Sequence, residues 1–233
     1  MPELRQLGAD EIADLPLAWP VLGHRILGRG AVSSFVDDQV ATPGGQTMSR
    51  QYLLHPGAVG IIALDDADRI AVVRQYRHPV GFQLTEPPAG LLDHAAEDPL
   101  VAAARELAEE AGLRAARWQV LVDVFTTPGA NQESLRIYLA TGLTRAPAPD
   151  GFVADHEEAE MEVCWAARAD LVDAVLAGRV QNPTMVSGVL ALETARLSGR
   201  LEQLRPAGSP WPARTVWAAR NDALAGFGDG NGA

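Results

Sequence analysis

Short runs of apolar residues, separated by polar turns, recur along most of the chain. Their length and composition are typical of buried β-strands. We expect strands within 21–40 and at 58–64, 70–75, 118–125, 135–140 and 161–166. Glycine-rich or acidic turns separate several of these runs, at residues 28–30, 43–45 and 65–69. The acidic turn lacks the glycine and the distal glutamate of a calcium loop, so we interpret it as a hairpin turn.

Three stretches have the composition of helices. The clearest is 102–111, which consists almost wholly of strong helix formers. Asp98 is a suitable N-cap, Pro99 a suitable first residue, and Gly112 a suitable left-handed residue after the last turn. The ranges 168–176 and 184–197 are also predicted to be helical. Strands that alternate with helices predict an α/β layered domain, whereas the pattern loosens from residue 198 onward.

The first predicted helix carries three carboxylates, Glu106, Glu109 and Glu110, whose spacing brings them together. Its apolar stripe is expected at 101, 104, 107, 108 and 111, with the acidic face pointing away from the packing face. Two charges ~4 Å apart repel by about 4 kcal/mol at an effective dielectric constant of about 20. The face is therefore either solvated, as most charge runs are, or bound to a hard divalent cation.

The composition limits the classes of protein to which the chain can belong. Its 233 residues, 47% of them hydrophobic, suffice for one substantial domain with a core. The net charge of −11 makes the chain a poor candidate for binding nucleic acid or an anionic membrane. The sequence contains no lysine, so any anion would be recognised by arginine guanidinium groups.

The cellular location can also be predicted from the sequence. The single cysteine, Cys164, excludes an internal disulfide, and we interpret it as a buried small residue rather than a nucleophile. Residues 1–20 lack the apolar core of a signal peptide, and no stretch approaches the ~18 apolar residues of a membrane span. We expect a soluble cytoplasmic protein.

The segment 97–113 reads Glu-x7-Arg-Glu-Leu-Ala-Glu-Glu-Ala-Gly-Leu. It resembles the signature of the Nudix hydrolases, Gly-x5-Glu-x7-Arg-Glu-(apolar)-x-Glu-Glu-x-Gly-(apolar), at every fixed position from Glu97 to Leu113. Gly90 lies one residue farther from Glu97 than in the pattern, which affects the loop and not the helical spacing. The resemblance implies an α/β/α sandwich with a mixed sheet. We expect N-terminal strands at 1–54, the hydrolase domain at 55–200 and a partly disordered tail at 201–233.

Segments on both sides of this motif resemble the bacterial ADP-ribose pyrophosphatases of that family. They are Arg74-Gln75-Tyr76-Arg77, Glu86-Pro87-Pro88-Ala89-Gly90, the segment 126–129 with Glu133 and Ser134, and the acidic run 157–160. Taken singly, they have plain explanations, such as surface arginines, turns or a solvated loop. Taken together, they predict substrate contacts in which two arginines clamp a diphosphate. The expected substrate-binding residues are Arg74, Tyr76, Arg77, Glu86, Pro128 and Glu133.

The resemblance also implies a site for Mg²⁺ or Mn²⁺. The expected ligands are the side chains of Glu106, Glu109 and Glu110 and the backbone carbonyl of Ala89. Arg105 and Glu97 are expected to hold these carboxylates in place. In this branch of the family the general base comes from a later acidic loop. By position it is Glu158, which we also count among the metal ligands, followed by Glu157 and then Glu160.

The expected reaction is hydrolysis of ADP-ribose to AMP and ribose 5-phosphate. One alternative is hydrolysis of another nucleoside diphosphate sugar or of an oxidised nucleotide. Another is a sensor that binds ADP-ribose without cleaving it, although sensors usually lose the carboxylates of the motif. A serine hydrolase is disfavoured because the sequence contains no Gly-x-Ser-x-Gly elbow. Relatives exchange their N-terminal parts between subunits, so the resemblance also implies a homodimer.

Overall fold

The computed structural model describes residues 4–94, 97–146 and 161–227. They form two compact units. The first, here the central unit, comprises Gly30–Ser34 and Tyr52–Pro210. The second, here the terminal unit, combines the two ends of the chain, Met1–Arg29, Phe35–Gln51 and Trp211–Ala233. Of the expected tail at 201–233, residues 201–210 are therefore part of the central unit, and the described residues from 211 onward are grouped with the N-terminal strands.

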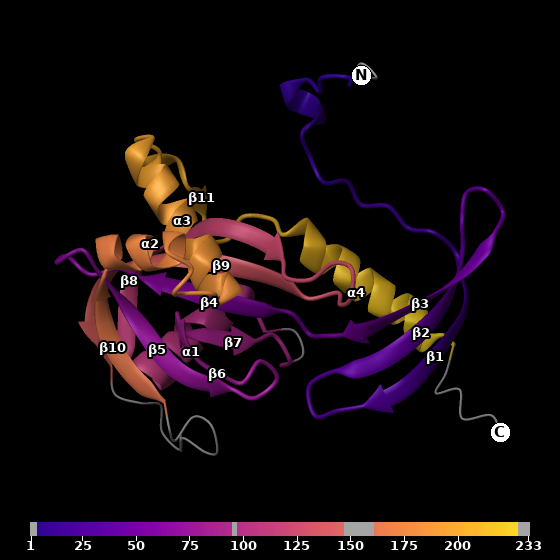
Figure 1. Ribbon diagram of the computed structural model, residues 1–233, viewed down its shortest axis with the longest axis horizontal. Helices are drawn as coiled ribbons and strands as arrows, with labels where there is room; N and C mark the ends of the chain where they lie inside the picture. Colours follow the sequence, from indigo (N-terminus) through magenta and orange to yellow (C-terminus); the bar gives the residue numbers. More distant parts are fainter. Residues whose placement is uncertain (1–3, 95–96, 147–160, 228–233) are drawn as a thin grey trace. The chain divides into compact units, whose positions relative to one another are not determined.

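A five-stranded mixed sheet forms the middle of the central unit (Figure 1). β4 pairs in parallel with β9, whereas the other neighbouring strands pair antiparallel. In spatial order the strands are β11 (Arg205–Pro206), β8 (Leu113–Phe125), β9 (Ser134–Arg145), β4 (Ala58–Ala63) and β7 (Ala89–Leu91). β4 is buried along nearly its whole length, as its continuous apolar sequence predicts.

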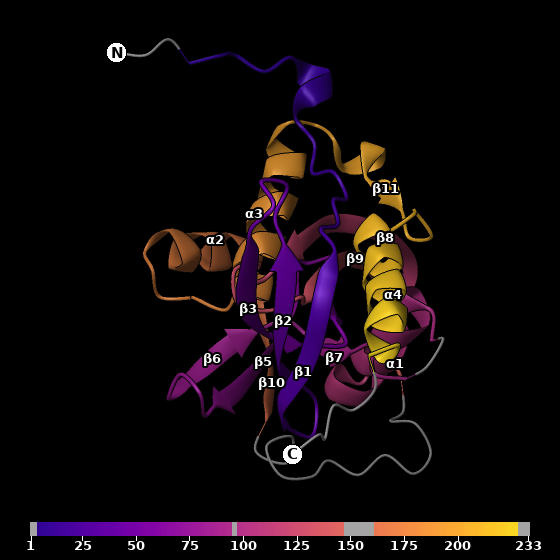
Figure 2. The ribbon, with the colours of Figure 1, turned by 90° about the vertical axis from the view of Figure 1, so that its right-hand side faces the viewer.

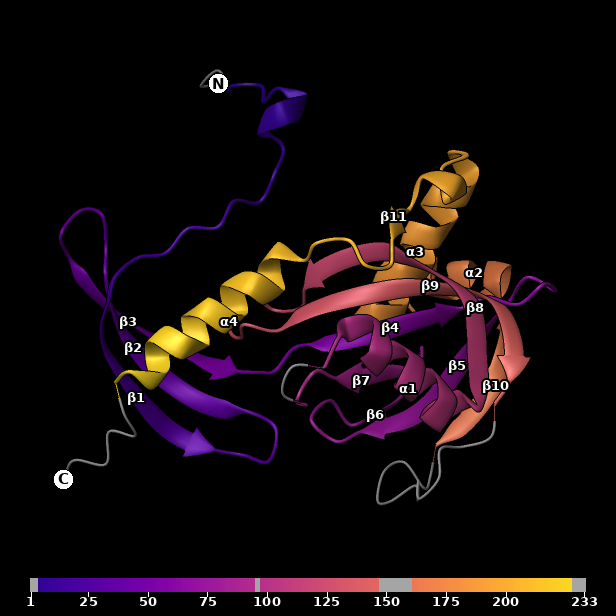
Figure 3. The same cartoon turned by 180° about the vertical axis from the view of Figure 1, so that it is seen from behind.

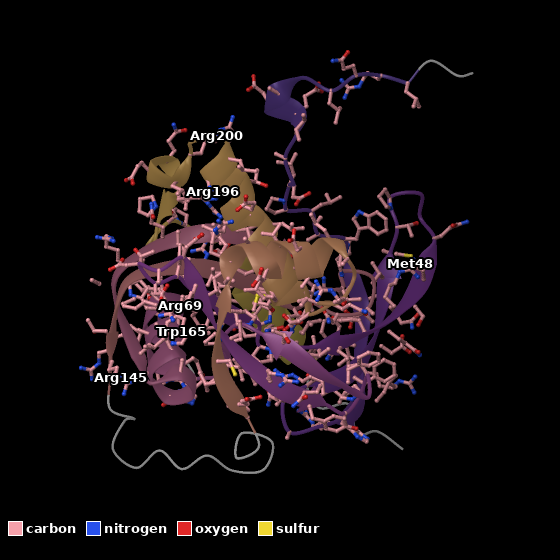
Figure 4. All side chains as sticks on the ribbon, turned by 60° about the vertical axis from the view of Figure 1, so that its left-hand side comes forward. Met48, Arg69, Arg145, Trp165, Arg196 and Arg200 are labelled. Carbon is pink, nitrogen blue, oxygen red and sulfur yellow. The ribbon has the colours of Figure 1, made fainter. Side chains whose placement is uncertain are left out.

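A smaller antiparallel sheet lies beside it, in the order β10 (Glu162–Ala167), β5 (Arg69–Arg77) and β6 (Phe82–Glu86). The acidic turn between β4 and β5 is a hairpin turn, as expected. Asp65 closes it by accepting hydrogen bonds from the N–H groups of Ala67 and Arg69 and by pairing with the Arg69 side chain. The Arg69 guanidinium also lies 5.2 Å from the centre of the Trp165 ring, which joins β5 to β10 (Figure 4).

Helices cover both faces of the five-stranded sheet, which confirms the predicted sandwich. Gly60 and Gly90 show this directly, because a side chain at Gly90 would meet Glu106 of α1, whereas one at Gly60 would meet Thr184 of α3. Figure 3 shows α1 in front of β7 and β4. The bounds of the helices are α1 (Pro99–Ala111), α2 (Arg168–Leu176) and α3 (Pro183–Leu197), followed by the short helix η3 (Leu201–Gln203). In the part of the chain that is described, no helix is both long enough and apolar enough to span a bilayer.

The core between the sheet and α3 is apolar and tightly closed. Ile62, Ile137, Met185 and Val189 are fully buried there. Each such side chain stabilises the fold by about 1.5–3 kcal/mol relative to its exposed state. The core also explains why residue 188 is glycine, because a side chain there would lie 2.6 Å from Ile62.

Two buried arginines connect elements of the central unit through hydrogen bonds and ion pairs. Arg168, the first residue of α2, donates two hydrogen bonds of 2.8 Å to the Asp68 carboxylate and pairs with Glu193 of α3. Arg136 of β9 donates to both oxygens of Asp123, at 2.7 and 3.0 Å. It also donates to the backbone carbonyls of residues 209 and 210, at 2.8 and 3.1 Å. Buried guanidinium groups require such partners, because an unpaired buried charge is strongly destabilising.

The terminal unit contains a three-stranded sheet with β2 in the middle, and α4 runs alongside the strands (Figure 2). Val36 and Val40 of β2 and Leu224 of α4 are buried. The elements of this part of the chain are η1 (Ala9–Glu11), β1 (Val21–Arg29), β2 (Ser34–Ala41), β3 (Thr47–Leu54) and α4 (Pro212–Ala225). The last residues of β3 belong to the central unit.

A buried ionic cluster lies inside the terminal unit. The carboxylate of Asp38 is fully buried, and it accepts from Arg220 of α4 at 3.3 Å. The Nδ1 atom of His24, on β1, lies 2.6 Å from the other oxygen of Asp38. One carboxylate thus links two strands of the sheet to the C-terminal helix.

Several elements differ from the sequence prediction. β6, β7 and α4 were not predicted, and β8 begins at Leu113 rather than at residue 118. β7 is only three residues long and contains Gly90, so it has too few side chains to show a pattern. α4 carries mixed polar and apolar residues, and we expected a loosened tail there. Its contacts with the N-terminal strands, which are remote in sequence, stabilise it.

We expect Asp38→Asn to destabilise the terminal unit. The change removes the shared negative charge while the ring of His24 remains buried. Removing one member of a buried ion pair costs roughly 3–5 kcal/mol, and we expect the lower value because the side chain of Arg220 is half exposed. Urea unfolding would measure the free energy of unfolding. Asp222→Asn on the exposed side of α4 is the matched control, and equal stability of the two variants would contradict the prediction.

Candidate active site

The local sequence determines both ends of α1 as predicted. The Asp98 side chain accepts a 2.8 Å hydrogen bond from the N–H of Leu100, and Pro99 is the first helical residue. Gly112 takes the left-handed conformation with φ 61°, and its N–H donates to the carbonyl of Ala108. These caps fix both ends of the helix, and with them the positions of its carboxylates.

The acidic residues of α1 point inward, so the predicted orientation of the helix was wrong. Val101, expected in the packing stripe, is 57% exposed, whereas Ala102 and Ala103 are fully buried. At about 100° per residue, Glu106 and Glu110 lie between these two alanines around the helix. The acidic face is therefore part of the packing face. The stripe was misjudged because alanines occur on every side of this helix and give little contrast.

Two residues of β7 explain how the sheet accommodates the carboxylates. A Cβ atom at Gly90 would lie 2.1 Å from the Glu106 carboxyl carbon, so Glu106 lies directly over the glycine backbone. The N–H of Ala89 donates a 2.9 Å hydrogen bond to Oε2 of Glu110. A glycine and an N–H group of one short strand thus give two of the three carboxylates space and a partner.

Arg105 provides the positive charge of this cluster. Its Nη1 donates to Glu106 at 2.8 Å and to Glu109 at 3.0 Å. Its Nε and Nη2 donate to the two oxygens of Glu97, both at 3.2 Å. These hydrogen bonds from Arg105 lower the pKa of Glu97, and the Glu97 carboxylate in turn raises the pKa of Arg105. All four side chains are largely buried, so the ion pairs are less screened than pairs at the surface.

The chemical type of these donor atoms, carboxylate oxygens, suits a hard divalent cation. The set contains three carboxylates on one helix face and lies over a strand whose glycine leaves space for Glu106. Within the described ranges, however, no group of three or more His, Cys, Asp or Glu side chains is close enough to hold a metal ion. Glu106 and Glu109 turn to Arg105, and Glu110 turns to Ala89. The candidate carboxylates thus lie on one helix face, but they accept hydrogen bonds from protein donors.

The predicted arginine pair does not form one clamp within the chain. Arg74 and Arg77 are three residues apart on β5, so their side chains leave opposite faces of the strand. Arg77 donates to Glu86 at 3.0 and 2.7 Å in a bidentate pair, on the face that carries buried Val73. Arg74 donates to Glu162 and to Gln83, both at 3.0 Å, and lies on the face of Tyr76.

Glu133 and Pro128 lie in the connection between β8 and β9. The Glu133 carboxylate accepts from the hydroxyl of Thr126 and lies 3.5 Å from Nδ1 of His55. Pro128 is inside a turn closed by hydrogen bonds to the carbonyl of Thr127. Ala58 of β4 pairs with residue 135 on one side and residue 91 on the other. Glu133 is therefore near the C-terminal end of β7, whereas Glu86 precedes its N-terminal end.

The three remaining candidates, Glu157, Glu158 and Glu160, lie outside the described residues. Conversely, sequence reasoning missed His55, Gln83 and Glu162 as partners of predicted residues. No sequence motif marks these three residues, because strand pairing in the folded protein brings each of them close to its partner. Cys164 is partly buried, and desolvation raises the pKa of its thiol, which disfavours the thiolate form that a nucleophile needs.

Comparisons with known proteins identify the family of this chain. The family described as NUDIX domain matches residues 54–186. An ADP-ribose pyrophosphatase of Mycobacterium tuberculosis is 46% identical over 200 residues, which are 85% of this chain and 94% of the relative. An ADP-ribose pyrophosphatase of Bacillus subtilis is 34% identical over 52% of this chain and 64% of its own length. A solved structure described as an ADP compounds hydrolase superposes with a TM-score of 0.65, covering 81% of this chain and all of the other. At 19% identity it shows the fold alone.

We expect Gly90→Ala to abolish most activity at little cost in stability. The added methyl group would meet the movable carboxyl end of Glu106 rather than backbone, so the fold can adjust by displacing that side chain. A misplacement of about 1 Å in a catalytic group costs about 100-fold in rate. Turnover of ADP-ribose and thermal unfolding would both be measured. Gly208→Ala is the control because a side chain there meets nothing within 4 Å, and a fully active Gly90→Ala protein would show that Glu106 needs no such space.

Proposed function

The chain belongs to the Nudix family of hydrolases, and we propose that it hydrolyses ADP-ribose to AMP and ribose 5-phosphate with the help of a divalent cation. The observation that supports the proposal most is the inward-facing acidic side of α1, where Glu106 and Glu110 lie against Gly90 and Ala89. The names of two relatives support the choice of substrate, and one of them matches nearly the whole chain.

The three glutamates of α1 and the carbonyl of Ala89 are the proposed holders of Mg²⁺ or Mn²⁺. When bound there, the cation neutralises diphosphate oxygens and lowers the pKa of the attacking water. Arg105 and Glu97 are proposed to hold these carboxylates in place through the hydrogen bonds that Arg105 donates. The base that takes the proton of the water is proposed to be Glu158, with Glu157 and Glu160 as the next candidates in the same acidic run.

Arg77 is the strongest candidate for contact with the diphosphate. Its side chain is 41% exposed, and the buried carboxylate of Glu86 holds its Nε and Nη2 atoms. Glu86 is then better suited to orient the guanidinium than to contact the substrate itself. Arg74 and Tyr76 remain proposed contacts for another part of the substrate, because they leave the opposite face of β5. Pro128 and Glu133, near the other end of β7, remain proposed contacts as well.

The proposed assembly is a homodimer that forms through the terminal unit. Large apolar side chains are exposed on its strands, among them Leu22 at 59% and Phe35 at 41%. Exposed apolar groups of this kind mark interaction surfaces when they lie together. Sedimentation equilibrium distinguishes the states, since a single chain has a mass of 24.8 kDa. The cytoplasmic location predicted from the sequence stays a prediction.

A substrate panel tests the proposed function. Purified protein is incubated with ADP-ribose, ADP-glucose, NADH, diadenosine polyphosphates and 8-oxo-dGTP, each with Mg²⁺, Mn²⁺ or chelator. We expect AMP and ribose 5-phosphate from ADP-ribose at the highest kcat/KM, with no product in chelator. A higher kcat/KM for another member of the panel would change the substrate. Tight binding of ADP-ribose without any product would favour a sensor.

A pair of substitutions tests the base. We expect Glu158→Gln to lower kcat by roughly 100-fold or more, since general-base catalysis contributes about 10²–10⁴-fold. Divalent-ion binding, followed by calorimetry, should change much less than kcat if Glu158 acts as the base alone, whereas a comparable loss of ion binding would show that it is also a metal ligand. Glu157→Gln removes the same charge at the neighbouring position and serves as the matched control. If Glu157→Gln proves the more damaging of the two, the base is Glu157.

A further inference from the structure

Arg105 occupies the same carboxylates that a metal ion would need. Its Nη1 alone bridges Oε1 of Glu106 and Oε2 of Glu109, at 2.8 and 3.0 Å. A carboxylate oxygen that accepts a charge-assisted hydrogen bond at this distance directs that lone pair to the guanidinium. Arg105 therefore does more than orient the two carboxylates. Its positive charge also offsets their negative charge, as an external cation would.

The guanidinium has a second partner that leaves the metal ligands alone. Its Nε and Nη2 hold the two oxygens of Glu97, which precedes the helix and is mostly buried. This fork-to-fork pair uses a different edge of the guanidinium from the one that faces Glu106 and Glu109. Arg105 can consequently give up Nη1 without losing its charge partner.

We propose that Arg105 is the resident counter-cation of the acidic face and competes with the divalent ion for Glu106 and Glu109. Without the ion, it holds together carboxylates that would otherwise repel each other. With the ion, it yields these two residues and stays paired with Glu97. This proposal rests on the proposed function only in that α1 receives a divalent cation, and it is independent of the substrate.

The competition predicts an effect opposite to that of a purely supporting arginine. If Arg105 only oriented the ligands, its removal would weaken ion binding. If it competes, Arg105→Gln should bind Mn²⁺ roughly five- to tenfold more tightly, because the ion no longer displaces a salt bridge. The same variant should unfold at a lower temperature in chelator, by about 2–4 °C, and near the wild-type temperature in saturating Mn²⁺.

Calorimetric titration of the metal-free protein with Mn²⁺ measures the affinity without any substrate. Arg117→Gln is the matched control, because it removes one positive charge from an exposed site on β8, where the Nε of Arg117 donates a 3.2 Å hydrogen bond to the hydroxyl of Thr141. The control should change the affinity little. Weaker or unchanged Mn²⁺ binding by Arg105→Gln, with an unchanged control, would overturn the proposal.

Glu97 supplies a second test through a double-mutant cycle. Glu97→Gln should weaken Mn²⁺ binding, because Arg105 then loses the partner to which it retreats. In the Arg105→Gln background the same change should have no effect, which separates retreat of the arginine from direct ligation by Glu97. An equal loss of affinity in both backgrounds would contradict the proposed competition.

Should Arg105→Gln fail to fold, the wild-type protein still decides the matter. Arginine side-chain NMR follows the Nε–H and Nη groups of Arg105 while the metal-free protein is titrated with Mg²⁺, which is diamagnetic and is used here instead of Mn²⁺. The Arg105→Lys variant identifies the signals of Arg105. We expect the Nε–H of Arg105 to stay protected while its Nη1 protons lose protection on Mg²⁺ binding. Unchanged Nη1 protection at saturation would refute the proposal. A protein that passes these tests but hydrolyses another substrate would disprove only the proposed function.

Discussion

The arrangement of the site depends on burying carboxylates against a strand. Glu106 and Glu110 point from α1 into the layer between helix and sheet, where desolvation makes an unpaired charge costly. Three surrounding residues offset this desolvation cost, each in a different way. Gly90 leaves room, the N–H of Ala89 donates a hydrogen bond, and Arg105 brings a positive charge. A helix with its acidic face in solvent would need none of these features, and it would also bring no carboxylates to the edge of the sheet.

Local features of α1 could be predicted, whereas its orientation could not. Caps at Asp98 and Gly112 act within a few residues, so the sequence alone determines both ends of the helix. The choice of packing face depends on the partner surface. Here that surface includes a glycine eight residues before the N-cap, and its missing side chain decides where a glutamate can lie. Alanines on every side of the helix made the apolar contrast too weak to reveal this.

The same distinction applies to the fold. Strongly apolar strands such as β4 and β9 were predicted because each carries its own hydrophobic signal. β7 has only three residues and β6 mixes apolar with polar residues, so neither gives that signal, and their place follows from pairing with β4 and β5. α4 was missed because its stabilising contact is with a carboxylate 182 positions away, Asp38, which only folding brings near Arg220. The shared face of the glutamates on α1 was therefore predictable from their spacing, but the unit built from both chain ends was not.

Strand geometry also changes the meaning of the Arg-Gln-Tyr-Arg segment. In the sequence, the two arginines of this segment are only three residues apart. Because side chains alternate along β5, they nevertheless point to opposite faces of the strand. Arg77 is then held by Glu86, just before the prolines that lead into β7, and so its position is tied to the strand beneath the acidic helix. Arg74 instead joins the outer strands β10 and β6 through Glu162 and Gln83. Arg77 is thus paired with the residue that precedes β7, whereas Arg74 is paired with the outer strands, and one substrate group cannot contact both side chains within one chain.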